Sequence, residues 1–315
     1  MNNIFPSLIL KVYKFDLKEE DVAMDQLTFC IVDVFAEEKY QGNQLAVFYN
    51  CENLTQEDMQ KIAKETNFSE TTFIISRDKI NGGYDVRIFT PEFEVPFAGH
   101  PTLGTAYVIH REFENSMPQK IVLNLGVGQI PVMFGQDEYL WMKQKQPQFG
   151  RAVDAGTVAE ILGISSSWID TGFPIQDVST GLPSVIIPLK SLEAVRSCRI
   201  NHEKFISFKS REFSSNLLVF CKDTYKNEND LNVRVFAEEA GFPEDAATGS
   251  ANGNLAGYLL KYAFFKKEHI EYSVEQGFEI GRPSILKVKA GLTGNEFDIN
   301  VGGRVFPVAK GEWYL

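Results

Sequence analysis

The chain contains one sequence pattern twice, and this duplication constrains its fold more than any other feature. Residues 87–109, RIFTPEFEVPFAGHPTLGTAYVI, and residues 234–260, RVFAEEAGFPEDAATGSANGNLAGYLL, both begin with arginine, a β-branched residue and phenylalanine. Both then carry acidic residues, reach a turn glycine (Gly99 or Gly249) and continue into a run rich in small residues. This order is typical of a strand, a loop, a tight turn and a helix. The pattern predicts two similar halves with one glycine turn each; a coincidental likeness of two such units is the alternative.

The length of the chain also fits two domains. At 315 residues it is longer than an average domain, and two units of about 130–150 residues account for it. We expect an extension at residues 1–26, a first domain at 27–145 and a second domain at 150–300, with KQPQFG at 145–150 as the linker. Residues 300–315 either finish the second domain or return to the first. Because each half combines short strands with one or two helices, the predicted fold class is α+β.

Two further helices are marked by capping boxes, in which a threonine is followed three residues later by an acidic residue. Thr55 and Asp58 predict a helix at 55–68. Thr157 and Glu160 predict a second helix, which is expected to start at the threonine.

The charge and motif content of the chain argue against several classes of function. The net charge of −11 and the isoelectric point near 5.0 argue against nucleic acid or an anionic membrane as a partner. The apolar run at 4–12 is too short to span a bilayer and lacks the flanking features of a signal peptide. The sequence has neither a Gly-x-Gly-x-x-Gly turn after an opening strand nor a phosphate-loop lysine motif, so no nucleotide cofactor is expected.

Cysteine and histidine usage indicates a metal-free protein of a reducing compartment. The four cysteines lie far apart without a Cys-x-x-Cys pair, which fits free buried thiols and a cytoplasmic location. The four histidines lack metal-ligand spacing, so no structural metal is expected. These residues are Cys30, Cys51, Cys198, Cys221, His100, His110, His202 and His269.

Four side chains combine reactive chemistry with positions at turns. Glu70 lies between a predicted helix and strand, where a solvated loop carboxylate is the simpler interpretation. His100 begins a helix, where the helix dipole disfavours its cationic form and a plain cap is the alternative. Asp245 and Ser250 flank the second glycine turn, and capping is again the alternative.

Combining the two halves strengthens the case for chemistry. Each glycine turn presents free backbone N–H groups at a helix N-terminus, which is a favourable site for an anion. Two such turns facing each other across a cleft would hold a small carboxylate from both sides. Burial would raise the pKa of Glu70 so that it could exchange a proton near neutral pH, with His100 or Asp245 handling a second proton. The predicted chemistry is acid–base catalysis at carbon without metal or cofactor.

Several longer segments extend these observations to most of the chain. They are VDVFAEEKYQGNQLAVF (32–48), NFSETTFI (67–74), RIFTPEFEVPFAGHPTLGTA (87–106), EDAATGSANGNLAGYL (244–259) and QGFEIGRPS (276–284). In this order and spacing they resemble the PhzF-like phenazine biosynthesis isomerase family. The resemblance runs from about Leu27 to near the C-terminus.

The resemblance implies a fold and an activity. The fold is diaminopimelate-epimerase-like, with two pseudo-symmetric domains, each a curved, barrel-like sheet around a central helix, and an active site between them. The C-terminal segment would then return to the first domain. The implied activity is cofactor-free isomerisation of dihydro-hydroxyanthranilate, in which a hydrogen moves between ring carbons. A homodimer is the family-level expectation for the assembly.

The resemblance also implies roles for individual residues. Glu70, within Ser-Glu-Thr, corresponds to the catalytic acid/base, and Ser69 beside it is assigned to substrate binding. His100, Asp245 and Ser250 correspond to residues that bind substrate and assist proton transfer. The remaining assignments are a substrate contact at Asn43 and turn amides at Gly99 and Gly249.

Two other functions compete with this assignment. A binding protein that kept the cleft and lost the reaction is the first alternative, and the intact set of reactive residues speaks against it. A thiol epimerase of the same fold is the second, but neither glycine turn carries a cysteine. Gln44 and Ala246 stand where proline is common in the family, which affects loop rigidity more than chemistry. The substrate is left open beyond a small carboxylate.

Overall fold

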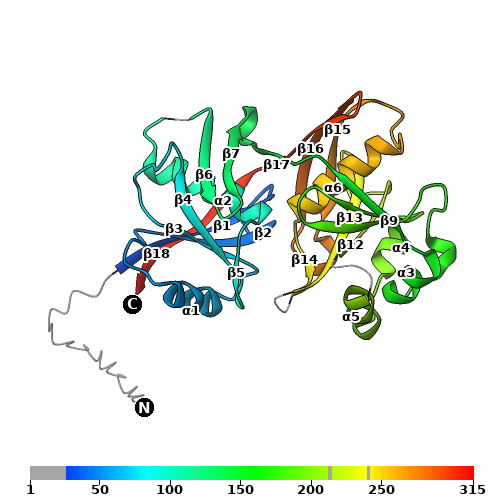
Figure 1. The fold of residues 1–315 in the computed structure, drawn as a ribbon, viewed down its shortest axis with the longest axis horizontal. Helices are drawn as coiled ribbons and strands as arrows, with labels where there is room; N and C mark the ends of the chain where they lie inside the picture. The colour runs from blue at the N-terminus through cyan, green and yellow to red at the C-terminus, as the bar shows by residue number, and fades with distance from the viewer. Residues whose placement is uncertain (1–25, 117, 212–214, 240–241) are drawn as a thin grey trace, which may run out of the picture.

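The computed structural model describes residues 26–116, 118–211, 215–239 and 242–315. The predicted extension at 1–26 therefore lies outside the described residues, apart from Gln26. Figure 1 shows two halves side by side, one around helix α2 and the other around helix α6. The domain boundaries stay a prediction, and the halves are defined below by their strands.

The first half consists of the following strands and α-helices, in chain order. They are β1 (Gln26–Val34), β2 (Asn43–Tyr49), α1 (Gln56–Thr66), β3 (Thr71–Ile74), β4 (Tyr84–Phe89), β5 (Glu94–Val95), α2 (Gly99–Phe113), β6 (Lys120–Leu125), β7 (Gly128–Phe134) and β8 (Leu140–Lys143).

The remaining strands and helices follow from residue 148 onward. They are β9 (Gln148–Ala152), α3 (Ala155–Leu162), β10 (Gln176–Ser179), β11 (Pro183–Pro188), α4 (Leu192–Ser197), α5 (His202–Arg211), β12 (Asn216–Cys221), β13 (Leu231–Glu239), β14 (Phe242–Asp245), α6 (Gly249–Lys261), β15 (His269–Gln276), β16 (Ser284–Thr293), β17 (Glu296–Gly303) and β18 (Val305–Tyr314). β9 begins inside the segment 145–150 that was predicted as a linker.

The two halves share one strand order. In the first half the order is β1-β2-β3-β4-β6-β7-β8, with parallel pairs at β2–β3 and β4–β6. In the second half it is β10-β11-β12-β13-β15-β16-β17, with parallel pairs at the equivalent positions, β11–β12 and β13–β15. The predicted α+β class with two similar halves, each a sheet around a central helix, is confirmed.

The strand that follows each set of seven is exchanged between the halves. β9 follows β8 along the chain but pairs with β10 of the second half. β18 follows β17 but pairs with β1 over its whole length, from Gln26 opposite Tyr314 to Val34 opposite Val305. β8 and β17 also pair with each other, so hydrogen-bonded strands run continuously from one half to the other.

The two central helices are buried around most of their circumference. The buried side chains of α2 include Leu103, Ala106 and Ile109, and those of α6 include Leu255 and Leu259. Their small residues let the sheet approach closely. A Cβ added at Gly104 would lie 2.6 Å from Leu45 Cδ2, and one added at Gly257 would lie 2.8 Å from Pro147 Cβ. The small-residue runs that define the sequence duplication are therefore required by the packing of sheet on helix.

One capping prediction is confirmed and one is wrong. At the start of α1 the Thr55 hydroxyl accepts from the Asp58 N–H and the Asp58 carboxylate accepts from the Thr55 N–H, as the capping box requires. Helix α3 begins at Ala155, before the predicted Thr157. Its cap is Asp154, whose carboxylate accepts from the Thr157 N–H at 2.8 Å. Aspartate is as favourable at the N-cap as a hydroxyl residue, so the helix begins after Asp154 and not at Thr157.

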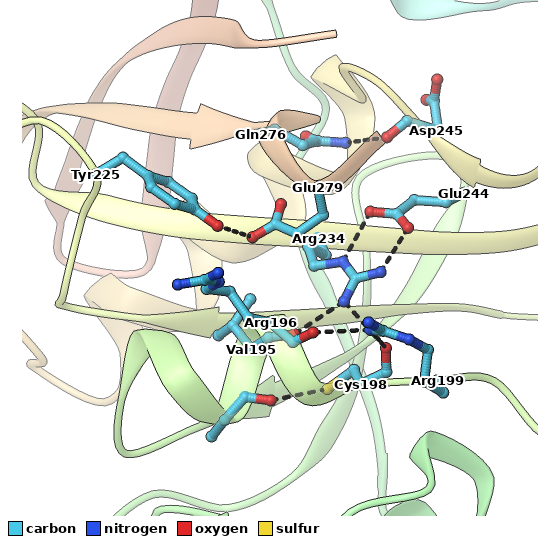
Figure 2. A network of polar contacts seen from close by, with 11 residues as sticks. Val195, Arg196, Cys198, Arg199, Tyr225, Arg234, Glu244, Asp245, Gln276 and Glu279 are labelled. Atoms are coloured by element: carbon cyan, nitrogen blue, oxygen red, sulfur yellow. Dashed lines mark hydrogen bonds and ion pairs between the residues drawn. The ribbon is translucent and has the colours of Figure 1, made fainter. Parts of the chain in front are cut away.

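Each copy of the duplicated segment contains an ion pair between its two strands. Arg87 on β4 binds Glu94 on β5 through two N–H groups, at 2.7 and 2.5 Å. Arg234 on β13 binds Glu244 on β14 in the same bidentate way, at 2.8 and 2.7 Å. Figure 2 shows the Arg234 guanidinium between this carboxylate and the backbone at the end of α4. Each pair fixes the loop that leads to a glycine turn.

Membrane insertion by a helix finds no support in the described part of the chain, where every helix is too short or too polar to cross a bilayer.

Candidate active site

The N-termini of α2 and α6 meet at the boundary between the halves. A Cβ added at Gly99 would lie 3.5 Å from the Ser250 nitrogen and 3.6 Å from the Gly249 Cα. The residues that precede these helices, Ala98 and Thr248, make no side-chain capping bond. The first N–H groups of both helices therefore point at one place without an acceptor from their own helix, and two positive dipole ends coincide there.

Capping, the alternative considered for three sequence-predicted residues, is wrong in this structure. His100 and Ser250 lie within the first turns of their helices, and Asp245 lies four residues before α6. Because no side chain caps either helix, these residues are available to other partners.

A pocket of about 480 Å³ opens over the paired helix ends, a volume in the range of small-ligand sites. Side chains of both halves line it. Among the lining residues are Ser69, Glu70, Gly99, His100, Asp245, Gly249 and Ser250. Seven of the eight sequence-predicted site residues thus share one cavity, and the eighth, Asn43, lies outside its lining.

Glu70 and His100 face each other inside this pocket. Glu70 Oε2 lies 3.6 Å from His100 Nε2, and both atoms are buried without a hydrogen-bond partner. Burial raises the pKa of Glu70 from 4.5 to about 7 and lowers the pKa of His100 from 6.5 to about 4. Near neutral pH the histidine is therefore neutral, and the glutamate exchanges its proton readily.

Asp245 is the second carboxyl group of the site and is half-buried. Its Oδ1 accepts from Asn43 Nδ2 at 2.7 Å and its Oδ2 accepts from the Thr248 hydroxyl at 2.6 Å. Burial raises its pKa, the charge of Glu70 adds to this, and the charge of His100 acts in the opposite direction.

Asn43 lies behind the pocket wall and joins the two halves. Besides Asp245, its amide nitrogen contacts the Ala247 carbonyl oxygen at 3.1 Å and His100 Nδ1 at 3.2 Å. Its side chain is buried and does not line the cavity. This arrangement suits a residue that holds other site residues in place.

Arg282 is a site-supporting residue that the sequence interpretation missed. Its guanidinium donates to the carbonyl oxygens of Gly42 (2.9 Å) and Gln41 (2.7 Å) and to Asp33 Oδ1 (2.7 Å). Gly42 has φ +70°, and a Cβ there would lie 2.3 Å from a backbone oxygen, so only glycine fits the turn. Arg282 thus holds the turn that positions Asn43. Its place in the motif QGFEIGRPS was the available signal.

The cysteines play no part in this pocket. All four are free and buried, as predicted, and none lines the cavity. Burial raises the pKa of Cys30 to about 11 and those of Cys198 and Cys221 to about 12, so these thiols are poor nucleophiles. Among the described residues no group of three or more His, Cys, Asp or Glu side chains is arranged to hold a metal ion.

The opposite pKa shifts of Glu70 and His100 predict opposite effects on stability. A raised glutamate pKa lowers stability as pH rises from 4.5 to about 7, because the unfolded chain ionises first. A lowered histidine pKa lowers stability as pH falls from 6.5 to about 4, because the unfolded chain is protonated first. Each effect is worth roughly 3 kcal/mol, so they largely cancel in the wild-type protein.

Single substitutions should expose each effect in thermal unfolding between pH 4 and 7.5. We expect the Tm of Glu70→Gln, relative to wild type, to rise with pH from 4.5 to 7. The relative Tm of His100→Asn should rise as pH falls from 6.5 to 4. The control is Glu57→Gln, which removes a carboxylate that is 77% exposed. Tm differences that stay constant with pH in both site variants would contradict the assigned shifts.

Comparison with known proteins gives a consistent picture over both halves. A family model described as "Phenazine biosynthesis-like protein" (PhzC-PhzF) matches residues 32–311. The trans-2,3-dihydro-3-hydroxyanthranilate isomerase of Pseudomonas aeruginosa is 32% identical over 292 residues, which cover 91% of this chain and 99% of that protein.

Comparison with solved structures gives the same family and the same fold. The phenazine biosynthesis protein of the PhzF family from Bacillus anthracis superposes with a TM-score of 0.86 at 27% identity, covering 93% of this chain and all of that one. A hydroxyproline epimerase from Agrobacterium vitis has a TM-score of 0.59 at 9% identity, covering 92% and 93% of the two chains, so that likeness concerns the fold alone.

Proposed function

The chain belongs to the PhzC-PhzF family of phenazine biosynthesis-like proteins and is an isomerase, and we propose that it moves a proton between carbons of a small carboxylate substrate in the pocket between its halves. In this proposal Glu70 is the acid/base, and neither metal nor organic cofactor takes part. The family relationship supports the reaction class, and the pocket supports the assignment of residues.

One observation carries the proposal: two buried polar atoms, Glu70 Oε2 and His100 Nε2, lack partners and face each other beside two uncapped helix ends. Buried polar groups in folded proteins are nearly always paired. Unpaired groups in a ligand-sized pocket are therefore expected to find their partners on a ligand. The helix N-termini favour a carboxylate on that ligand.

The proton transfer follows from the two pKa values. Ionised Glu70 removes a proton from a carbon next to an unsaturated system, and the electron pair of the broken C–H bond shifts into that system. Protonated Glu70 then returns the proton to another carbon on the same face, so the overall reaction is redox-neutral. Neutral His100 hydrogen-bonds the reacting substrate, and the N–H groups at Gly99 and Gly249 hold its carboxylate.

The test is incorporation of deuterium from heavy water into candidate substrates. Wild type and Glu70→Gln would be incubated with cyclic and amino carboxylates, including the dihydro-hydroxyanthranilate named for the Pseudomonas relative, and analysed by mass spectrometry. Both label and isomerised product must be scored, since a proton can return without exchange. Label or product with wild type and none with the variant supports the proposal.

The same experiment addresses the alternative of a binding protein without activity. Affinity for carboxylates that is unchanged in Glu70→Gln, with neither label nor product across the panel, would favour binding alone.

A further inference from the structure

The mouth of the pocket carries large apolar side chains at the tips of three turns. Phe93 lies between β4 and β5, Val127 between β6 and β7, and Leu182 between β10 and β11, with exposed fractions of 46, 43 and 48%. All three line the pocket. Turn tips usually carry glycine or small polar residues, and exposed apolar side chains are usually scattered. Convergence of three of them on one cavity points to a ligand contact.

Two of these turns are held by side-chain hydrogen bonds. Thr90 Oγ1 accepts from the N–H groups of Glu92 and Phe93, at 3.2 and 3.0 Å. The buried Asn254 side chain on α6 accepts from the Thr180 N–H at 2.6 Å and donates to the Leu182 carbonyl oxygen at 2.8 Å. The third turn contains only two residues, since Leu125 pairs with Gly128.

The apolar lining extends beyond these three side chains. Other apolar lining residues are Val95, Pro96, Phe97, Ile130 and Met142. The lining also contains polar and charged side chains outside the helix ends, namely Thr90, Lys143, Gln144, Lys145, Thr180 and Asn216. The pocket therefore combines the ionisable groups at the helix N-termini, Glu70, His100 and Asp245, with an apolar surface that includes the three turn side chains.

Building on the proposed function, we propose that the substrate is a carboxylic acid whose end remote from the carboxylate is an unsubstituted hydrocarbon ring or chain. The carboxylate binds at the helix ends, and the hydrocarbon part lies against Phe93, Val127 and Leu182. Amino or hydroxyl groups placed against these three side chains would find no hydrogen-bond partner in them.

Binding of unreactive probes tests this proposal without turnover. Benzoate and its 4-methyl, 4-ethyl and 4-propyl derivatives would be titrated calorimetrically, beside the 4-hydroxymethyl derivative and the methyl ester of benzoate. We expect affinity to rise up to about fourfold per methylene and to fall for the hydroxylated probe. In Phe93→Ser and Leu182→Ser the affinity should rise less with each added methylene than in the wild type. The control is Ile206→Ser, which removes an apolar side chain that is 58% exposed on α5 and should leave the increase in affinity per methylene unchanged.

The outcomes separate the two proposals. Affinity that stays flat or falls along the alkyl series overturns the apolar substrate class, even where labelling in heavy water still shows isomerase activity. Equal binding of benzoate and its methyl ester contradicts the carboxylate site and with it the proposed function.

A second inference, from a different observation, concerns Gln276 at the end of β15. This fully buried side chain makes four hydrogen bonds around the loop that precedes α6. Its Nε2 donates to the Asp245 carbonyl oxygen and to Thr248 Oγ1, both at 3.0 Å. Its Oε1 accepts from the Thr248 N–H at 3.2 Å and from Asn252 Nδ2 at 3.0 Å. Figure 2 shows the Gln276 amide beside Asp245.

The backbone fixes the orientation of this amide. The Thr248 N–H can only donate and the Asp245 carbonyl can only accept, so a flipped amide would lose both bonds. Nε2 therefore donates to Thr248 Oγ1, which leaves the hydroxyl hydrogen of Thr248 for Asp245 Oδ2. Because Asn43 donates to the other oxygen of Asp245, both carboxylate oxygens are acceptors.

We propose that Gln276 is a positioning residue that fixes the direction of the hydrogen bonds from Gln276 through Thr248 to Asp245. This direction keeps Asp245 ionised, so the exchangeable proton of the site belongs to Glu70. The titratable groups whose charges act on Asp245 are Glu70, before β3, and His100, on α2.

Titration of aspartate carboxyl carbons by NMR tests this role in the full-length protein. Asp245 would be assigned with Asp245→Asn in protein labelled with ¹³C at aspartate. Thr248→Val removes one donor at constant shape, and we expect the Asp245 titration to move up by about one pH unit. Gln276→Glu should also raise the pH at which Asp245 titrates. Thr248→Ser keeps the hydroxyl, so its Asp245 should titrate as in the wild type.

A merely structural role for this network predicts a different result. Lower stability in Thr248→Val and Gln276→Glu, with an unchanged titration of Asp245, would overturn the proposal.

Discussion

Glu70→Gln is expected to reduce isomerisation and label exchange by about a thousandfold, within the usual range for removal of a general acid or base. The amide keeps the size of the side chain but cannot take up a proton. Substrate binding should change little, because the carboxylate is held by the helix ends at Gly99 and Gly249. The measurement is single-turnover product formation beside calorimetric affinity for an inert carboxylate.

A nearby carboxylate provides the control for this experiment. Glu65 lies five residues earlier, exposed on α1, and Glu65→Gln should retain wild-type activity. Undiminished turnover in Glu70→Gln would show that another group is the base. Loss of carboxylate binding together with activity would show that Glu70 acts mainly through the structure of the pocket.

Glu244→Ala is expected to destabilise the protein by about 3–5 kcal/mol, because it leaves the buried guanidinium of Arg234 without its hydrogen-bonded carboxylate. The side chains of this pair are only 6 and 8% exposed. The duplication supplies a matched control in Glu94→Ala, since the side chains of Arg87 and Glu94 are 29 and 32% exposed. Removing the partner there should cost at most about 1 kcal/mol.

Urea unfolding of the two variants measures this difference directly. Replacing both Arg234 and Glu244 by methionine should recover much of the loss, because the buried charge is removed along with its partner. Equal losses in Glu244→Ala and Glu94→Ala would contradict the role assigned to burial.

The features that were predictable from the sequence are local. The turn glycines, the small-residue helices and the reactive residues beside them lie within short segments, so their pattern could be interpreted without the fold. Glu70, His100 and Asp245 were found in this way. The sequence predicts loops for the acidic runs after Arg87 and Arg234, but these runs contain the short strands β5 and β14. Two to four residues without alternating polarity carry too little signal for a strand.

The supporting contacts of the site were not predictable, because they join distant parts of the chain. Arg282 reaches the turn at Gln41 and Gly42 from about 240 residues away, and Asn43 reaches Asp245 across 202 residues. No local pattern encodes such a pairing. Gln276 illustrates the limit: it was noticed only as part of a family motif, and its hydrogen bonds appear only when β15 lies beside the loop before α6.

The exchange of β9 and β18 has a consequence for the order in which the protein is made. The strands of the second half, β9 to β17, are all present once Gly303 has emerged from the ribosome, so their internal pairings can form during synthesis. β1 precedes the other described strands along the chain, yet one of its two neighbours is β18, which follows all of them. Such distant pairing forms slowly, and an unpaired strand edge invites aggregation meanwhile. The first half is therefore completed only after the strands of the second half have been made, and one edge of β1 stays unpaired until β18 follows.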